Sequence, residues 1–144
     1  MDTYRYNVSL RIWHPSSDPA VFTATLGLEP LHFDVVGQHR TRKGKTLDVL
    51  AKESYWTHEF DSAGEPQDVE EFLLDRAYSL TQHKEFFTDI CASGGRAEFF
   101  IGFFPENFNC GFELSPLLQR QCADLNLCLS FDIYGYNPEP SDEA

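Results

Sequence analysis

Residues 4–12 read YRYNVSLRI, and their side chains alternate between apolar or aromatic and polar along the whole stretch. Successive side chains of an extended strand point to opposite faces of a sheet. The alternation therefore predicts a strand that places Tyr4, Tyr6, Val8, Leu10 and Ile12 on a core, while the intervening residues face water. Of all segments in the chain, this one gives the clearest strand pattern.

Two helices are predicted from their start and stop residues. Asp18-Pro19 is a capping residue followed by proline at the first helical position, and Gly27 follows Leu26, which predicts a short helix over residues 19–26. A longer helix is expected over residues 68–91, because Asp68 and Glu71 have capping-box spacing and apolar residues recur at three- and four-residue steps up to Cys91. Gly94-Gly95 ends that pattern.

The second half of the chain predicts further strands and one more helix. Residues 97–104 are apolar on both faces, which is typical of an interior strand, and residues 111–114 are expected to form a short strand. Ser115-Pro116 repeats the cap-and-proline start of a helix that ends near Asn126. A final strand follows, and the residues predicted to face the core are Leu127, Leu129, Phe131 and Ile133.

Between the first helix and residue 54 the periodicity of apolar residues is weak, because glycines and a run of basic residues interrupt it. We expect an irregular region with strand fragments, one of them at residues 33–36, followed by a strand over residues 55–60 that carries Trp56. This order predicts an α+β fold, with a mixed or antiparallel sheet, helices on one face and an elaborated ferredoxin-like topology. Residues 1–136 are predicted to form one domain, and residues 137–144 a disordered acidic tail.

Charge and composition narrow the possible partners. The formal net charge is −12, from 11 basic and 23 acidic residues, which disfavours nucleic acid and anionic membranes as partners. No apolar run approaches the roughly 20 residues of a membrane helix or resembles a signal peptide, so a cytoplasmic protein is expected. The four cysteines show no metal-binding spacing, and no cofactor or metal is expected.

Several segments, in order along the chain, resemble one family. The most specific are Leu26-Gly27-Leu28-Glu29-Pro30, at the end of the first predicted helix, and Asp132-Ile133-Tyr134 in the closing strand. The others are residues 9–13, residues 18–25, Gly37, Trp56 and residues 114–116. Over most of its length the chain is similar to the bacterial family called domain of unknown function 4279 (DUF4279). The resemblance implies a compact α+β bacterial domain and carries over no catalytic residues.

The basic residues between positions 39 and 45 form the first candidate site. Arginine guanidinium groups suit bidentate recognition of phosphate or carboxylate, and Gly44 allows backbone N–H groups to approach an anion. The spacing is not that of a P-loop, so a solvated loop that balances nearby acidic residues explains the same segment. The candidate anion-binding residues are Arg40, Arg42, Lys43 and Lys45.

Aromatic residues form the second candidate site. Trp56, beside Tyr55, and Trp13 offer rings on which a planar ligand stacks, although large aromatic residues on strands more often belong to the core. The Phe-rich stretch 99–108 fits a strand covered on both sides, a homodimer face, or a partner surface on which Phe104 and Phe108 are exposed and Glu98 and Glu106 form the rim.

Acidic residues and histidines give no defined catalytic pattern. Glu98, Glu106, Glu113 and Asp132 lie on or near predicted strands, but no spacing makes them converge, and solvated carboxylates are the simpler interpretation. The five histidines show no HExxH motif, and GxSxG is absent.

Two hypotheses about function follow. The first is a non-enzymatic protein-interaction domain whose acidic surface binds a basic partner, as an immunity protein binds a toxin. The second is a domain that binds a small anionic ligand or phosphate through Arg40, Arg42, Lys43 and Lys45, with Trp56 as a wall.

Overall fold

The computed structural model describes residues 4–62 and 68–138 of the chain. Its larger sheet contains, in spatial order, β2 (His32–Asp34), β5 (Ser54–Phe60), β1 (Tyr4–His14), β6 (Arg96–Pro105) and β7 (Leu127–Ile133). Only the β6–β7 pair is parallel, and the other neighbours are antiparallel. A separate hairpin is formed by β3 (His39–Arg42) and β4 (Lys45–Leu50).

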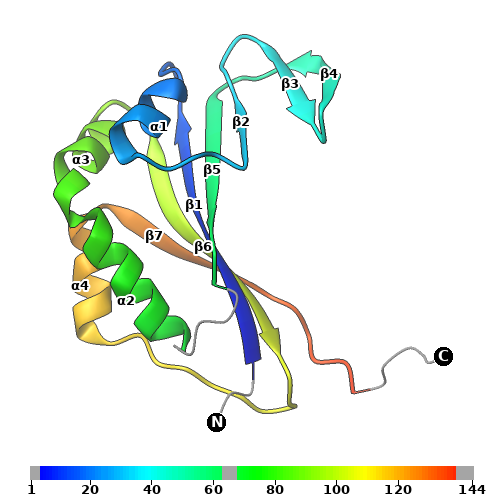
Figure 1. Ribbon diagram of the computed structural model, residues 1–144, viewed down its shortest axis with the longest axis vertical. Helices are drawn as coiled ribbons and strands as arrows, with labels where there is room; N and C mark the ends of the chain where they lie inside the picture. The colour runs from blue at the N-terminus through cyan, green and yellow to red at the C-terminus, as the bar shows by residue number, and fades with distance from the viewer. Residues whose placement is uncertain (1–3, 63–67, 139–144) are drawn as a thin grey trace.

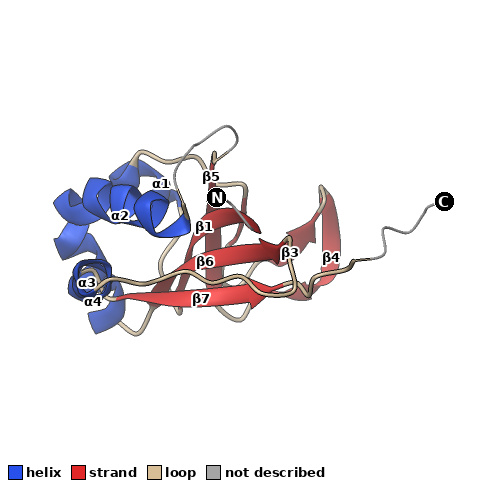
Figure 2. Cartoon of the chain, turned by 90° about the horizontal axis from the view of Figure 1, so that it is seen from below, coloured by secondary structure: helices blue, strands red, loops and turns tan. Residues whose placement is uncertain are grey.

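The helices lie on one side of this sheet and the β3–β4 hairpin lies on the other (Figures 1 and 2). They are α1 (Ala20–Leu26), α2 (Val69–Leu80), α3 (Lys84–Ala92) and α4 (Pro116–Asp124), with a single 3₁₀ turn, η1 (Thr81–His83), between α2 and α3. The predicted α+β class and the placement of helices on one face are confirmed.

The predicted topology is also present. The elements β1, α1, β2, β5, α2–α3 and β6 follow the strand–helix–strand–strand–helix–strand order of ferredoxin-like folds. The third of these strands, β5, lies beside the first, with the second and fourth on the two flanks. The hairpin is an insertion between β2 and β5, and α4 with β7 extends the sheet beyond β6.

Local sequence accounts for the helix ends. Asp18 accepts a hydrogen bond from the backbone N–H of Ala20, and Gly27, at φ +69°, closes α1 by donating its N–H to the carbonyl of Thr23. The Asp68–Glu71 capping box starts α2, and the Ser115 hydroxyl accepts from the N–H of Leu118 at the start of α4.

The core lies between the helices and the inner face of the sheet. Val8, Phe87 and Ile101 are fully buried in one apolar cluster, against which Phe131 packs. The predicted alternation of β1 is confirmed, because Val8, Leu10 and Ile12 are all inaccessible to solvent.

Some details of the predicted helices, strands and core are wrong. The expected helix 68–91 is interrupted at η1, where the side chains of Ser79, Thr81 and Gln82 donate to the carbonyls of Arg76, Tyr78 and Ser79 and compete with helical bonding. Ile133 is 59% exposed rather than part of the core.

The expected strand 111–114 is not a strand, and these residues pair with neither sheet of the described residues. Phe112 instead packs its ring against Tyr4, Phe103 and Phe131. The predicted acidic tail falls mostly on residues 139–144, which lie outside the described residues.

Candidate functional site

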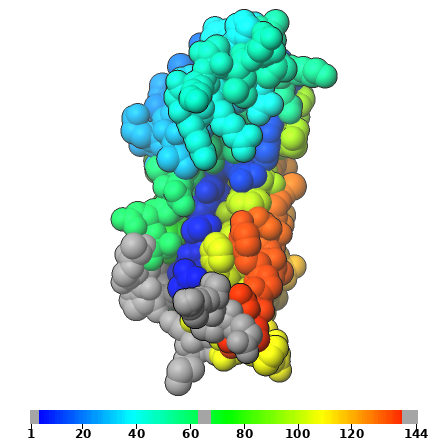
Figure 3. Space-filling view, turned by 90° about the vertical axis from the view of Figure 1, so that its right-hand side faces the viewer, coloured from blue at the N-terminus to red at the C-terminus, as the bar shows by residue number. Residues whose placement is uncertain are grey.

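The face of the sheet opposite the helices carries the polar side chains of the central strands. Register places Arg11 between Thr57 and Glu98, and Trp13 between Tyr55 and Arg96. Figure 3 shows the hairpin, in cyan, above the upper part of this face, with β1, β6 and β7 visible below it. We call this surface the open face.

The hairpin is built by a tight turn. Lys43 and Gly44 both have positive φ, +51° and +79°, as a type I′ turn requires, and Arg42 pairs with Lys45 on either side of them. At the base, the N–H of Gly37 donates to the carbonyl of Ala51, and the N–H of Ala51 donates to the carbonyl of Gln38. The basic segment is therefore an ordered hairpin.

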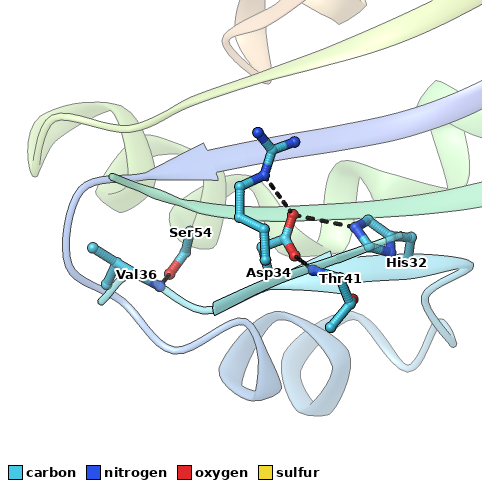
Figure 4. Close-up of polar contacts among 6 residues, drawn as sticks. His32, Asp34, Val36, Thr41 and Ser54 are labelled. Atoms are coloured by element: carbon cyan, nitrogen blue, oxygen red, sulfur yellow. Dashed lines mark hydrogen bonds and ion pairs between the residues drawn. The ribbon is translucent and has the colours of Figure 1, made fainter. Parts of the chain in front are cut away.

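Asp34 attaches the hairpin to the sheet. Its carboxylate, 4% exposed, accepts from the backbone N–H of Thr41 at 3.0 Å, while the Nε2 atom of His32 lies 3.2 Å away and Nε of Arg40 lies 3.6 Å away. Figure 4 shows Asp34 between His32 and Thr41, and Ser54 accepting a second bond from the N–H of Val36. A buried carboxylate with this many donors serves as a structural anchor.

A pocket of about 530 Å³ lies between the hairpin and the open face. This volume is within the range of small-molecule sites. Its lining residues come from the sheet, the hairpin and the segment that returns to β5: Arg11, Trp13, Asp34, Arg40, Val49, Leu50, Ala51, Lys52, Glu53 and Tyr55. We call it the hairpin pocket.

The rings of Trp13 and Tyr55 form an aromatic wall of the hairpin pocket. Their centroids are 5.3 Å apart, and the guanidinium carbon of Arg96 lies 4.3 Å from the Trp13 centroid. Arg96 in turn pairs with Glu53 at 3.6 Å. On the hairpin side, Val49 and Leu50 are about half exposed, so the pocket has apolar surface left for a ligand to cover.

Arg11 is the most deeply placed cation of the pocket. Its guanidinium carbon stacks 3.6 Å from the centroid of Phe100, and Nη1 lies 3.8 Å from Glu98, whose other oxygen accepts from the hydroxyl of Ser130. The Nε atom of Arg11 is shielded from solvent and has no hydrogen-bond partner in the part of the chain that the structure describes.

The structure divides the predicted anion-binding residues. Arg40 lines the hairpin pocket, whereas Arg42, Lys43 and Lys45 surround the hairpin tip and are exposed. Trp56 is a core residue and not a ligand wall, because it is fully buried on the opposite face and donates its indole N–H to the hydroxyl of Thr23 at 3.0 Å. Tyr55 and Trp13 are the aromatic residues that reach the pocket.

Trp13 and Tyr55 are predicted from the sequence as stacking residues, whereas Arg11 and Asp34 belong to no motif in the sequence. The alternation that starts the chain puts Arg11 on the same face as Trp13, and this pairing is a signal that was present in the sequence. The position of Asp34 next to the hairpin depends on tertiary structure.

The predicted partner residues Phe104 and Phe108 lie at the other end of the open face. Phe104 stacks on Tyr134, with centroids 4.6 Å apart, and Phe108, 86% exposed, touches the ring of Tyr136 edge-on. A hydrogen bond with Asp132 raises the pKa of the Tyr134 phenol. We call Phe104, Phe108, Tyr134 and Tyr136 the aromatic end cluster.

No second layer of helices or strands covers Phe100 and Phe104 in the part of the chain that the structure describes. Side chains of the open face lie over them instead, those of Arg11 on Phe100 and of Arg5 and Tyr134 on Phe104. The interpretation of residues 97–104 as a strand covered on both sides by other elements is therefore wrong.

Two of the acidic residues singled out in the sequence, Glu98 and Glu106, contact different partners and do not form a pair. Glu98 contacts Arg11 and Ser130, and Glu106 pairs with Arg5 at 3.0 Å. Within residues 4–62 and 68–138, no group of three or more His, Cys, Asp or Glu side chains is arranged to hold a metal ion. No helix in those ranges is long and apolar enough to cross a membrane.

Comparison with known proteins identifies a family. The family model described as Domain of unknown function (DUF4279) matches residues 3–136. No curated protein and no solved structure matches the chain.

Proposed function

The chain belongs to the DUF4279 family, and we propose that it is a binding domain that holds a small anionic molecule with a flat apolar part in the hairpin pocket. One observation carries the proposal: two arginines, Arg11 and Arg40, and two aromatic rings, Trp13 and Tyr55, line the same pocket. Guanidinium groups bind phosphate and carboxylate, and aromatic rings bind flat apolar groups.

The charge of the hairpin pocket supports an anion. Its lining includes three basic residues, Arg11, Arg40 and Lys52, and two acidic ones, Asp34 and Glu53. Arg40 pairs with Asp34 at 3.6 Å, and of the remaining charged residues Arg11 and Lys52 outnumber Glu53. In a protein of net charge −12, such a local positive region concentrates anions.

The proposal is limited to binding. Among the described residues, the pocket lining contains no cysteine, serine or histidine, and its Asp34 carboxylate is held by the N–H of Thr41. A cytoplasmic location and a lack of nucleic-acid partners are part of the same proposal, and rest on the acidic charge and the expectations from the sequence.

The test is ligand titration followed by tryptophan fluorescence, because Trp13 lines the pocket and Trp56 is buried in the core. Benzoate and phenyl phosphate are the ring-bearing probes, and acetate and inorganic phosphate are the matched probes without a ring. We expect the ring-bearing probes to bind more tightly, and Arg11→Met to weaken them at least about tenfold, as loss of a charged hydrogen bond does.

Arg5→Met is the matched control, because Arg5 lies on the same face of β1 but at the far end, beside Phe104. Its affinity for the probes should equal that of the wild type. Equal loss of affinity in the Arg11 and Arg5 variants would show that bulk charge, and not the hairpin pocket, attracts the anion.

A second candidate function is the binding of a basic protein partner, such as a toxin neutralised by an immunity protein. The aromatic end cluster favours it, because Phe108 is 86% exposed and exposed aromatic residues are enriched at protein interfaces. The net charge of −12 would speed the encounter with a basic partner. A basic protein that co-purifies in equal amounts with the wild type, but not with Phe108→Ser, would support this candidate, and retention by the variant would reject it.

A further inference from the structure

β7 is the edge of the five-stranded sheet on the side of the C-terminus. It pairs with β6 alone, and no other strand of the described residues lies beyond it. Figure 2 shows it at the margin of the sheet, beside β6. A strand in this position has one row of backbone N–H and C=O groups that is free to pair with another chain.

The edge strand lacks the features that usually prevent such pairing. Leu127–Ile133 contains no lysine, arginine or proline, and Asp132 is its one charged residue. Its register with β6 is continuous from the Ala97–Leu127 pair to the Phe103–Ile133 pair, so no bulge bends the edge away. The opposite edge is better protected, because β2 has three residues and Asp34 ties it to the hairpin.

We propose that β7 pairs in antiparallel fashion with β7 of a second copy of this chain, around a twofold axis at Ser130. Directly opposite residues of an antiparallel pair point to the same face of the sheet. A twofold axis between two identical strands therefore places one residue opposite its own copy. In β7 the central residue is Ser130. All seven residues then have partners, and the two sheets become one continuous sheet.

This register is complementary in side-chain chemistry. On the open face Cys128 lies opposite Asp132 of the other copy, so the two carboxylates do not face each other. On the inner face the opposite pairs are Leu127 with Ile133 and Leu129 with Phe131, all apolar. Ile133, which is 59% exposed in the single chain, gains an apolar neighbour. An axis at Asp132 would instead bring the two carboxylates together.

The first test is the molecular mass of the full chain in solution, by analytical ultracentrifugation over a range of concentrations. We expect a monomer–dimer equilibrium that shifts toward dimer as sodium chloride is added, because each copy carries a charge of −12 and salt screens their repulsion. A chain that stays monomeric at all concentrations and salt levels overturns the proposal.

The second test uses charge at position 128, because Cys128 is exposed and a larger side chain there has room in solvent. Cys128→Lys places a cation opposite Asp132 of the other copy and should tighten the dimer, whereas Cys128→Asp places like charges together and should weaken it. Two such pairs form per dimer, so each change is expected to be about 2- to 30-fold.

Two controls separate this interface from other contacts. Phe108→Ser alters the aromatic end cluster but not β7, so its dimer constant should match that of the wild type. In a Cys91→Ala background, Asp132→Cys should give a disulfide to Cys128 of the other copy under mild oxidation, identified by peptide mass spectrometry. A dimer that responds equally to both charges at position 128, or that Phe108→Ser abolishes, shows that β7 is not the interface.

Discussion

The carboxylate of Asp34 accepts a hydrogen bond from the backbone N–H of Thr41 across 3.0 Å, and this bond joins the five-stranded sheet to the hairpin that roofs the pocket. Asp34→Ala removes it together with the contacts to His32 and Arg40. We expect unfolding free energy to fall by about 1.5–3 kcal/mol, as for hydrogen bonds to charged groups. Amide hydrogen exchange should accelerate in residues 38–51 and stay slow in β1 and β6.

Asp48→Ala is the control for that prediction, because Asp48 lies on the same hairpin but is exposed. Its hairpin amides should exchange as in the wild type. If the hairpin of the Asp34 variant remains as protected as that of the control, Asp34 does not anchor it.

Gly95, just before β6, lies close to the end of β1 and to α3. A Cβ atom there would lie 2.6 Å from the carbonyl oxygen of Trp13 and 2.9 Å from the side chain of Ile90. Gly95→Ala should therefore lower the unfolding free energy by about 1–3 kcal/mol, the usual cost of overpacking. Urea denaturation measures the difference.

Gly102→Ala is the matched comparison within β6. The nearest atom to a Cβ at this position is Oδ1 of Asn7, the end of a side chain that is able to rotate away. This variant should lose less stability than Gly95→Ala. An equal or larger loss would contradict the close backbone contact at Gly95.

Cys122 gives a pH dependence with a defined sign. Burial in α4 raises the pKa of its thiol from 9.0 to about 11. Between these values the unfolded chain has lost the thiol proton and the folded chain has kept it, so Cys122 contributes a decrease in stability as pH rises from 9 to about 11. Below pH 9 the thiol is protonated in both states and contributes no pH dependence.

The measurement compares urea unfolding at pH 7.5 and pH 10.5. The loss of stability between these two conditions should be smaller in Cys122→Ala than in the wild type. A wild-type pH dependence that survives in Cys122→Ala would show that other groups produce it.

Much of the fold could be predicted because the capping residues and the spacing of apolar side chains indicate the same helices and strands. The alternation of residues 4–12 predicts β1 and its buried face, and the caps at Asp18, Asp68 and Ser115 predict where three helices begin. The helix break at η1 was missed, because the apolar period continues from Leu80 to Phe87 while polar side chains around Thr81 change the backbone bonding.

The candidate site was less predictable, because it depends on which strands become neighbours. Arg11 is a polar residue of an alternating strand, and only the register with β5 and β6 places it beside Phe100 and Glu98. The basic run was the more conspicuous signal, yet the I′ turn directs three of its four selected cations to the hairpin tip. Tryptophan is a residue type that stacks on flat ligands, but Trp56 lies on the buried face of β5.

The most direct test of the hairpin pocket is a titration of ¹⁵N-labelled protein with phenyl phosphate, followed through the two indole N–H signals. Trp13 lines the pocket, and Trp56 is buried on the other face of the sheet with its N–H bonded to Thr23. We predict that the Trp13 signal shifts and saturates while the Trp56 signal stays in place. A Trp13 signal that does not move at any concentration, or two signals that move together, would contradict binding in this pocket.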